Sequence, residues 1–183
     1  SGYIGASVLR ALVAHEHEVT ALVRTDEKAQ AVRDAGGRAL VGDVTDTDVV
    51  RRLAHEADAV VHTASAQGID ADFIATVLTA LEGTPKPFVH TGGIFTFGDS
   101  THISEQSPAS PPAMTAWRRP NEAVVRASDA RTTIVAPGIA YRRGAGLPAL
   151  FVGVGEHQVR LPVHRSHRRA PVQLYVLRHL HAP

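Results

Sequence analysis

Residues 1–12 read SGYIGASVLRAL, a turn with glycines three positions apart that runs directly into an amphipathic stretch. A glycine in such a turn lets the backbone approach a pyrophosphate, and the next lets a helix pack closely on a strand. The helix N-terminus offers unpaired N–H groups and the positive end of its dipole to phosphate. Gly2 and Gly5 therefore predict the second half of a dinucleotide-binding turn, with a plain helix start as the alternative.

Apolar residues along the rest of the chain alternate between helical spacing and short strand-like runs. The predicted helices are 4–14, 27–35, 46–53, 73–81 and 122–127, and the predicted strands are 19–23, 39–41, 59–61, 88–90 and 132–136. This alternation indicates right-handed βαβ units and a parallel sheet. We predict an α/β fold with a doubly wound parallel sheet. Because no strand precedes Gly2, we expect the sheet to lack its first strand and to show a gap there.

Composition narrows the class of protein. With 183 residues and 44% hydrophobic content, the chain is long enough for one sizeable core. It has no cysteine, which excludes disulfides and zinc–thiolate sites, and no long apolar run, which argues against a membrane span. A net charge of +1 predicts no general affinity for nucleic acid. We expect a cytoplasmic protein with no membrane or nucleic-acid partner.

Five short motifs occur in an order and spacing that resemble one family. They are SGYIG (1–5), GDVTD (42–46), HTAS (62–65), FVHTGGIFTFG (88–98) and APGIAY (136–141). Over residues 1–155 the chain is similar to the extended and atypical short-chain dehydrogenase/reductases, the NAD-dependent epimerase/dehydratase type. The resemblance implies a Rossmann-like fold that binds NAD(P) and acts as an oxidoreductase or epimerase on a small carbonyl or sugar-like substrate.

The resemblance also implies which residues contact the cofactor. Gly2, Tyr3, Ile4 and Gly5 match the loop under the pyrophosphate. The other matching positions are Asp43 and Val44 beside the adenine, Ala64 and Ser65 in a turn that passes the cofactor, Thr91, and Pro137, Gly138 and Ile139 near the nicotinamide. The alternative for Asp43 is a helix cap, although Asp46 is better placed for capping.

Arg24 stands where cofactor choice is made in this family. An acid at that position binds the adenosine ribose hydroxyls, whereas an arginine accommodates a 2′-phosphate. Arg24 therefore favours NADP over NAD, although Asp26 nearby weakens the preference and a solvated loop charge remains the alternative. We predict no metal site, because His15, Glu16 and His17 are best explained as a solvated helix end.

The catalytic positions depart from the family pattern. The usual hydroxyl, tyrosine and lysine positions fall on Gly93, Trp117 and Asn121, none of which can exchange a proton or tune a neighbouring pKa. Thr91 and Tyr141 are the candidate substitutes, against the alternatives of a strand threonine and a packed ring. Two hypotheses remain open: an NAD(P)-dependent oxidoreductase or epimerase, and a non-catalytic dinucleotide-binding sensor, interaction module or inactive fragment.

Residues 156–183 differ in composition, because no acidic residue follows Glu156 while arginines continue. We interpret them as an aberrant remnant of the family's C-terminal substrate-binding portion, following the dinucleotide-binding domain of residues 1–155. One codon string for residues 165–170, read one base later, gives VHIDEL, which resembles the family pattern at this place. We therefore hypothesise a local frame slip within residues 163–173, and we expect a chain truncated at both ends.

Overall fold

The computed structural model describes residues 2–142 and 145–146. The predictions for residues 156–183, including the frame slip, lie outside this part. The α-helices are Tyr3–Ala14 (α1), Asp26–Asp34 (α2), Thr47–Glu56 (α3), Asp70–Leu81 (α4) and Arg118–Ala127 (α5), with a 3-10 helix at Ile94–Phe97 (η1). The strands are Thr20–Val23 (β1), Arg38–Val41 (β2), Val60–His62 (β3), Phe88–Thr91 (β4), Thr132–Val135 (β5), Tyr141–Arg142 (β6) and Ala145–Gly146 (β7).

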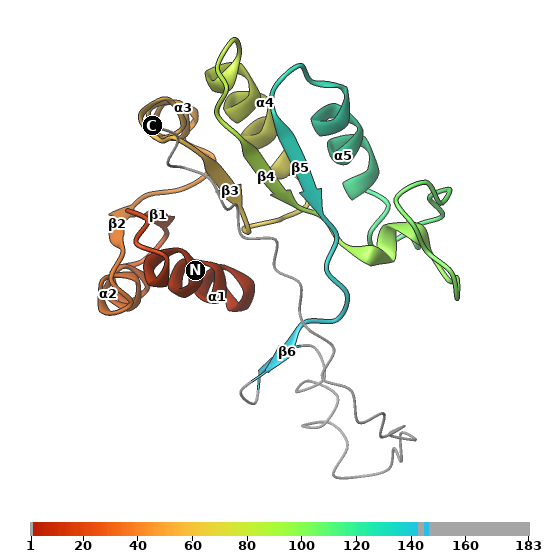
Figure 1. Ribbon diagram of the computed structural model, residues 1–183, viewed down its shortest axis with the longest axis horizontal. Coiled ribbons are helices and arrows are strands. Elements are labelled where there is room, and N and C mark those ends of the chain that lie inside the picture. Colours follow the sequence, from red (N-terminus) through yellow and green to blue (C-terminus); the bar gives the residue numbers. More distant parts are fainter. Residues whose placement is uncertain (1, 143–144, 147–183) are drawn as a thin grey trace.

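The first five strands are all parallel to their neighbours but form two sheets. One sheet is β1-β2 and the other is β3-β4-β5, and no described strand lies between β1 and β3 (Figure 1). The α3, α4 and α5 helices pack beside one another along the larger sheet. The predicted parallel α/β fold is thus confirmed, and the gap falls where the sequence predicted it.

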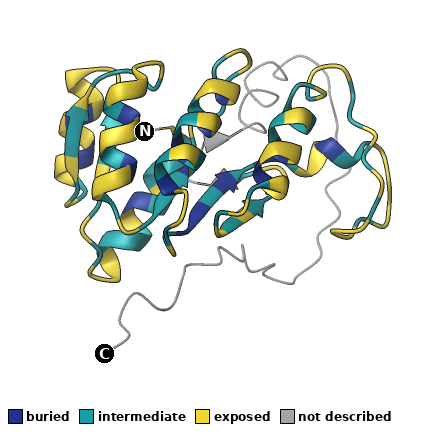
Figure 2. Ribbon diagram, turned by 90° about the horizontal axis from the view of Figure 1, so that it is seen from above, coloured by how far each residue is buried: buried dark blue, intermediate teal, exposed yellow. Residues whose placement is uncertain are grey.

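Two separate hydrophobic clusters accompany the two sheets. The larger is built from α3, α4, β4 and α5, and consists of Val50, Ile74, Val77, Leu81, Phe88 and Val125. The smaller joins α1, α2 and β1, and consists of Leu9, Val23, Ala29 and Val32. The helices turn their exposed sides outward and their buried sides toward the strands (Figure 2). Each cluster is therefore formed where the apolar side of a helix meets a strand.

Local side chains explain where several helices begin. The Asp46 carboxylate accepts hydrogen bonds from the backbone N–H groups of Asp48 and Val49, so it caps α3 as predicted. The Thr25 hydroxyl caps α2 by accepting from the N–H of Lys28. After α2 the chain turns through Gly36, whose φ of +86° favours glycine.

The structure extends two predicted helices and adds elements that the sequence pattern did not indicate. The α4 helix begins at Asp70 rather than residue 73, and α5 begins at Arg118 rather than residue 122. Pro120 fits α5 because its missing N–H falls in the first helical turn, where no intrahelical bond is made. The region 92–112 contains η1, and β6 pairs with β7 in an antiparallel hairpin. Within the described residues, each helix is too short or too polar to cross a membrane.

Candidate functional site

The carboxyl ends of three parallel strands meet at one edge of the larger sheet. In the register, His62 of β3 is opposite His90 of β4, and Thr91 is opposite Val135 of β5. The segments that follow these strands therefore begin side by side. In an open parallel sheet this edge is where ligands bind, especially where the strand order reverses.

The turn after β3 is held by Asp70 and Arg118. The Ser65 hydroxyl donates to Asp70 Oδ2 at 2.5 Å, and the Ala66 N–H donates to Asp70 Oδ1 at 2.7 Å. Arg118 Nη1, at the start of α5, donates to Ser65 Oγ at 2.9 Å. The Ser65 hydroxyl is thus engaged within the protein, while Ala64 is exposed. A ligand at this turn would therefore meet backbone atoms rather than the serine side chain.

Beneath this turn lies a buried pair of histidines. His62 Nδ1 is 3.0 Å from His90 Nδ1, and the His62 ring stacks on Phe73 with 4.3 Å between centroids. Burial lowers the pKa of His62, although the charge of Asp70 acts to raise it. Burial and the neighbouring His62 lower the pKa of His90 to about 4. Both rings are therefore neutral near pH 7, and neither supplies an acid in its protonated form.

The end of β4 lies close to a buried carboxylate on α5. Glu122 is 1% exposed, and a Cβ built at Gly92 would lie 2.6 Å from its Oε1, so glycine is needed for this approach. Burial raises the pKa of Glu122, although Arg126, Arg119 and Arg118 act in the opposite direction. Thr91 is half-buried, and a Cβ at Gly93 would meet no atom within 4 Å.

Arg24 and Asp43 follow the paired strands β1 and β2, in which Val23 is opposite Val41. The Thr45 backbone N–H and hydroxyl donate to Asp43 Oδ1 at 2.9 and 2.8 Å. The first of these bonds contributes most to holding the pKa of Asp43 below its ordinary value, and the Arg24 charge adds to the effect. Asp43 is therefore ionised near neutral pH and lies near Arg24. Val44 next to it is half-buried.

The glycine turn opens α1 as the sequence predicted. Gly2 is the N-cap of α1, with no side-chain cap, and its carbonyl accepts from the Ala6 N–H at 2.9 Å. Tyr3, Ile4 and Gly5 form the first turn, which contains no acidic residue. A Cβ at Gly2 would meet no atom within 4 Å. This open helix N-terminus suits an anionic group such as a pyrophosphate.

The positions expected for tyrosine and lysine are at the start of α5. The Trp117 indole N–H donates to the Met114 carbonyl at 3.1 Å, and the Arg118 guanidinium lies 4.7 Å from the centre of its ring. Asn121 is half-buried one turn further on. Lys86 Nζ donates to the His55 carbonyl at 2.6 Å, and Lys28 lies in α2. Neither lysine therefore takes the place of the absent one.

The segment after β5 returns beside η1. The Ile94 N–H donates to the Pro137 carbonyl at 3.1 Å, which places residues 137–139 next to the end of β4. Gly138 and Ile139 are both exposed, and Tyr141 begins β6. Of the predicted residues, Ser65, Thr91 and Pro137 therefore lie along one edge, while Arg24 and Asp43 lie beyond the gap on the smaller sheet.

Three residues of this edge were missed by the sequence reasoning, namely Asp70, Arg118 and Glu122. A signal for Asp70 was available, because an acidic residue shortly after a strand commonly begins a helix. No local signal marks Arg118, since its partner Ser65 is 53 positions away. A glutamate in an amphipathic helix likewise reads as exposed unless the facing glycine is known.

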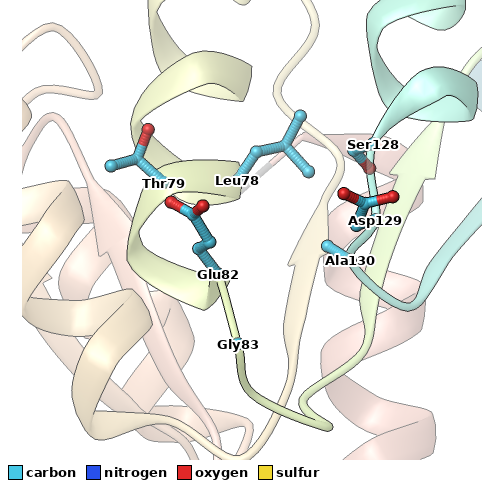
Figure 3. A pocket seen from close by; sticks show the side chains of 7 residues that line it. All are labelled: Leu78, Thr79, Glu82, Gly83, Ser128, Asp129 and Ala130. Atoms are coloured by element: carbon cyan, nitrogen blue, oxygen red, sulfur yellow. The ribbon is translucent and has the colours of Figure 1, made fainter.

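A surface cavity of about 230 Å³ occurs at the opposite end of the larger sheet. It lies between the ends of α4 and α5, and its lining includes Leu78, Glu82 and Asp129 (Figure 3). These residues precede β4 and β5 rather than follow them, so the cavity is distinct from the candidate cofactor edge. In the part of the chain that the structure describes, no group of acidic residues and histidines is arranged to hold a metal ion.

Comparison with known proteins identifies the class. A family model described as NAD(P)H-binding matches residues 1–182, so the chain belongs to the NAD(P)H-binding family. A nicotinamide dinucleotide is therefore the class of cofactor, and likeness to solved structures confirms the predicted Rossmann-like fold.

The chain is also similar to individual proteins and solved structures. The chain is 32% identical over 117 residues to Uncharacterized protein YLL056C of Saccharomyces cerevisiae, covering 58% of this chain and 39% of the yeast protein. A putative epimerase from Burkholderia cenocepacia superposes with a TM-score of 0.65 at 20% identity, covering 83% of this chain and 57% of that one. A UDP-glucuronic acid 4-epimerase from Bacillus cereus, solved in complex with NAD, gives a TM-score of 0.65 at 16% identity, covering 76% and 54%. The chain thus spans between about two fifths and three fifths of the length of these proteins.

Proposed function

We propose that this chain binds NADP in preference to NAD along the carboxyl edge of its strands, and that it performs no rapid chemistry on the bound cofactor. The observation that carries the proposal is the register of β3, β4 and β5, which sets the segments at Ser65, Thr91 and Pro137 beside one another. The cytoplasmic location expected from the absence of cysteine fits a cofactor of this kind.

The residues present fit the cofactor. The start of α1, with Gly2 open on its surface and no acid in its first turn, suits the pyrophosphate. The exposed guanidinium of Arg24 suits a 2′-phosphate, because an arginine can donate more than one hydrogen bond to phosphate. The ionised Asp43 beside it suits the adenine amino group.

The proposed lack of chemistry follows from the side chains near α5 and β4. When bound, a nicotinamide would supply hydride transfer, which needs a partner that holds or moves a proton on the substrate oxygen. Gly93 has no side chain, the indole of Trp117 is occupied by the Met114 carbonyl, and Asn121 does not titrate. The two histidines are buried and neutral. These features favour a dinucleotide-binding sensor or interaction module.

The second candidate function is an oxidoreductase or epimerase acting on a small carbonyl or sugar-like substrate. In that case Thr91 or Tyr141 would hold the substrate oxygen. The half-buried position of Thr91 at the end of β4, in line with the open space at Gly93, favours it as the candidate. Tyr141 is kept because a phenol can both donate and recover a proton.

Titration of the full chain with NADPH and with NADH tests the proposal directly. The expected result is saturable binding of both, tighter for NADPH, measured by calorimetry or by the fluorescence of the reduced nicotinamide. ATP and 2′-phosphoadenosine serve as competitors that report the adenosine half of the site alone. Absence of saturable binding by either dinucleotide would refute the proposed function.

A further inference from the structure

The Ser65 turn is fastened by side chains from two other elements. Asp70 is 1% exposed and takes one donor from the turn on each carboxylate oxygen, namely the Ala66 N–H on Oδ1 and the Ser65 hydroxyl on Oδ2. Arg118 reaches the same hydroxyl from the start of α5. The turn, α4 and α5 are thus joined through one serine side chain.

The donors and acceptors among Arg118, Ser65 and Asp70 can be assigned in only one way. A guanidinium can only donate, so Ser65 Oγ accepts from Arg118 and must turn its own hydrogen toward Asp70. The Asp70 carboxyl group accepts both from the Ser65 hydroxyl and from the backbone N–H of Ala66. The orientation of the hydroxyl is therefore fixed, and with it the conformation of the backbone between residues 64 and 66.

Arg118 is itself held in place. Its guanidinium lies over the Trp117 ring, and the side chain is half-buried between the Ser65 turn and α5. Its charge also helps to lower the pKa values of His62 and His90, and it opposes the burial that raises the pKa of Glu122. The Arg118 cation thus faces the carboxyl ends of β3 and β4, next to the positions Trp117 and Asn121 that carry no proton-transfer group.

We infer that Asp70 and Arg118 are positioning residues, which hold the backbone of Ala64 and Ser65 in the conformation that contacts the dinucleotide. The inference rests on the proposed function for the identity of the ligand. Arg118 acts through Ser65, and Asp70 acts both through Ser65 and through the Ala66 N–H. Neither residue discriminates between the two dinucleotides, because the turn lies away from Arg24. Asp70 and Arg118 do not belong to the five sequence motifs, and they support the cofactor-binding residues that do.

The first test compares dinucleotide affinity in single and double variants of the full chain. Arg118→Met keeps the length of the side chain and removes its donors, and Ser65→Ala removes the shared hydroxyl. Each is expected to weaken both NADPH and NADH about tenfold, with their ratio unchanged, since the loss of one hydrogen bond to a charged group is of that order. The double variant is expected to bind no more weakly than the single variants, because Arg118 acts through Ser65.

Matched controls separate positioning from general stability. Arg119→Met removes the neighbouring arginine, and Asp72→Asn changes an exposed acid on the first turn of α4; both are expected to leave affinity within twofold of wild type. Arg118→Lys keeps a donor and is expected to restore part of the affinity. A role in stability alone would lower the midpoint of thermal unfolding and leave the affinity of the folded protein unchanged, which would overturn the inference.

Amide hydrogen exchange provides a readout that needs no cofactor. In Asp70→Asn and Arg118→Met, exchange at Ala66 and its neighbours in the turn is expected to speed up about tenfold, while exchange in β4 stays as in wild type. If the wild-type protein binds neither dinucleotide, the proposed function is refuted. The hydrogen-exchange rates then still test whether Asp70 and Arg118 hold the turn. Equal exchange rates in wild type and both variants would refute the positioning roles.

Discussion

The Nδ1 atom of His62 lies 3.0 Å from the Nδ1 atom of His90, and the two residues are 3% and 1% exposed. One of these nitrogens must donate and the other accept, so the two rings cannot both be cationic. If His90 donates, His62 carries its remaining hydrogen on Nε2, which has no hydrogen-bond partner and lies 4.0 Å from Asp70 Oδ1. In that tautomer the nitrogen of His62 that carries the hydrogen is the one near the Asp70 carboxylate. In either tautomer the contact requires a neutral ring, so protonation by acid acts against it.

Acid is expected to destabilise the fold through His90. The unfolded chain binds a proton at this residue near pH 6.5, whereas folded His90, with its pKa lowered to about 4, does not until lower pH. The unfolded state thus binds more protons in this interval, so the free energy of unfolding falls as the pH drops from about 6.5 to about 4. The contribution is up to about 3.5 kcal/mol, at about 1.4 kcal/mol for each pKa unit. Urea unfolding at a series of pH values measures it.

The variant His90→Asn provides the comparison, because its amide occupies the place of Nδ1 and does not titrate. It is expected to flatten the pH dependence over this interval. His102→Asn, in an exposed loop, is the matched control and is expected to leave the profile as in wild type. Identical profiles for His90→Asn and wild type would contradict the prediction.

Glu122 is expected to destabilise the fold at neutral pH. Burial raises its pKa, so the folded state keeps a proton over a range where the unfolded chain has lost it. The stabilising contribution of this residue is fully present below the pKa of about 4.5 that it has in the unfolded chain. The contribution declines as the pH rises through the higher pKa of the folded state. Its Oε1 has no hydrogen-bond partner. Glu122→Gln should therefore raise the free energy of unfolding at pH 8 by about 1 kcal/mol, with little gain at pH 4. Arg126 Nη2 lies 3.6 Å from Glu122 Oε2, and a loss of stability at pH 8 would show that this ion pair outweighs the cost of burial.

Arg24→Ala should remove most of a preference for NADPH. A charge-assisted contact with phosphate contributes roughly 1.5–3 kcal/mol, so NADPH affinity should fall about tenfold or more while NADH affinity stays within twofold. Raising the salt concentration should weaken NADPH binding to wild type more than to the variant. Arg52→Ala, an exposed arginine in α3, is the control. Equal affinities of wild type for the two dinucleotides would refute the role of Arg24.

Turnover should be at background level with NADPH in excess and a panel of sugars, ketones and quinones. The reason is that general acid–base assistance contributes about 10²–10⁴ in rate, and Gly93, Trp117 and Asn121 do not supply it. The absorbance of NADPH at 340 nm follows the reaction. Measurable turnover that Thr91→Val or Tyr141→Phe abolishes would identify the substitute acid and support the second candidate function. Thr133→Val, which changes an exposed threonine of β5, is the control.

The sequence predicted those features of the fold that depend on residues close to one another along the chain. The alternation of apolar runs located each of the first five strands to within a residue or two, and Asp46 was correctly identified as a cap. The gap followed from the order of the elements. The hydrogen bonds that join Ser65 to Asp70 and Arg118 could not be predicted in the same way, because Arg118 and Ser65 meet only after α5 has packed on the sheet.

Glu122 illustrates the same limit. Helical spacing places it on the same face as Val125, but a glutamate is ordinarily expected to be exposed, and the contact with Gly92 shows that this one is buried. The roles of Thr91, Tyr141 and the cofactor-binding residues stay predictions, since they rest on the family pattern. Hydrogen bonds between distant elements depend on packing angles and side-chain rotamers, which composition and spacing do not encode.

The division of the strands into two sheets implies that the chain does not unfold as one cooperative unit. In the described structure β1-β2 and β3-β4-β5 share no ladder hydrogen bonds, each has its own hydrophobic cluster, and contacts between the two halves are slight beyond the packing of Leu22 on the larger cluster. Residues 2–42 form the smaller unit and have fewer buried side chains to stabilise them, so they should open first while β4 remains protected. A dinucleotide that contacts Arg24 on one unit and Ser65 on the other would then act as the link that makes the two halves unfold together.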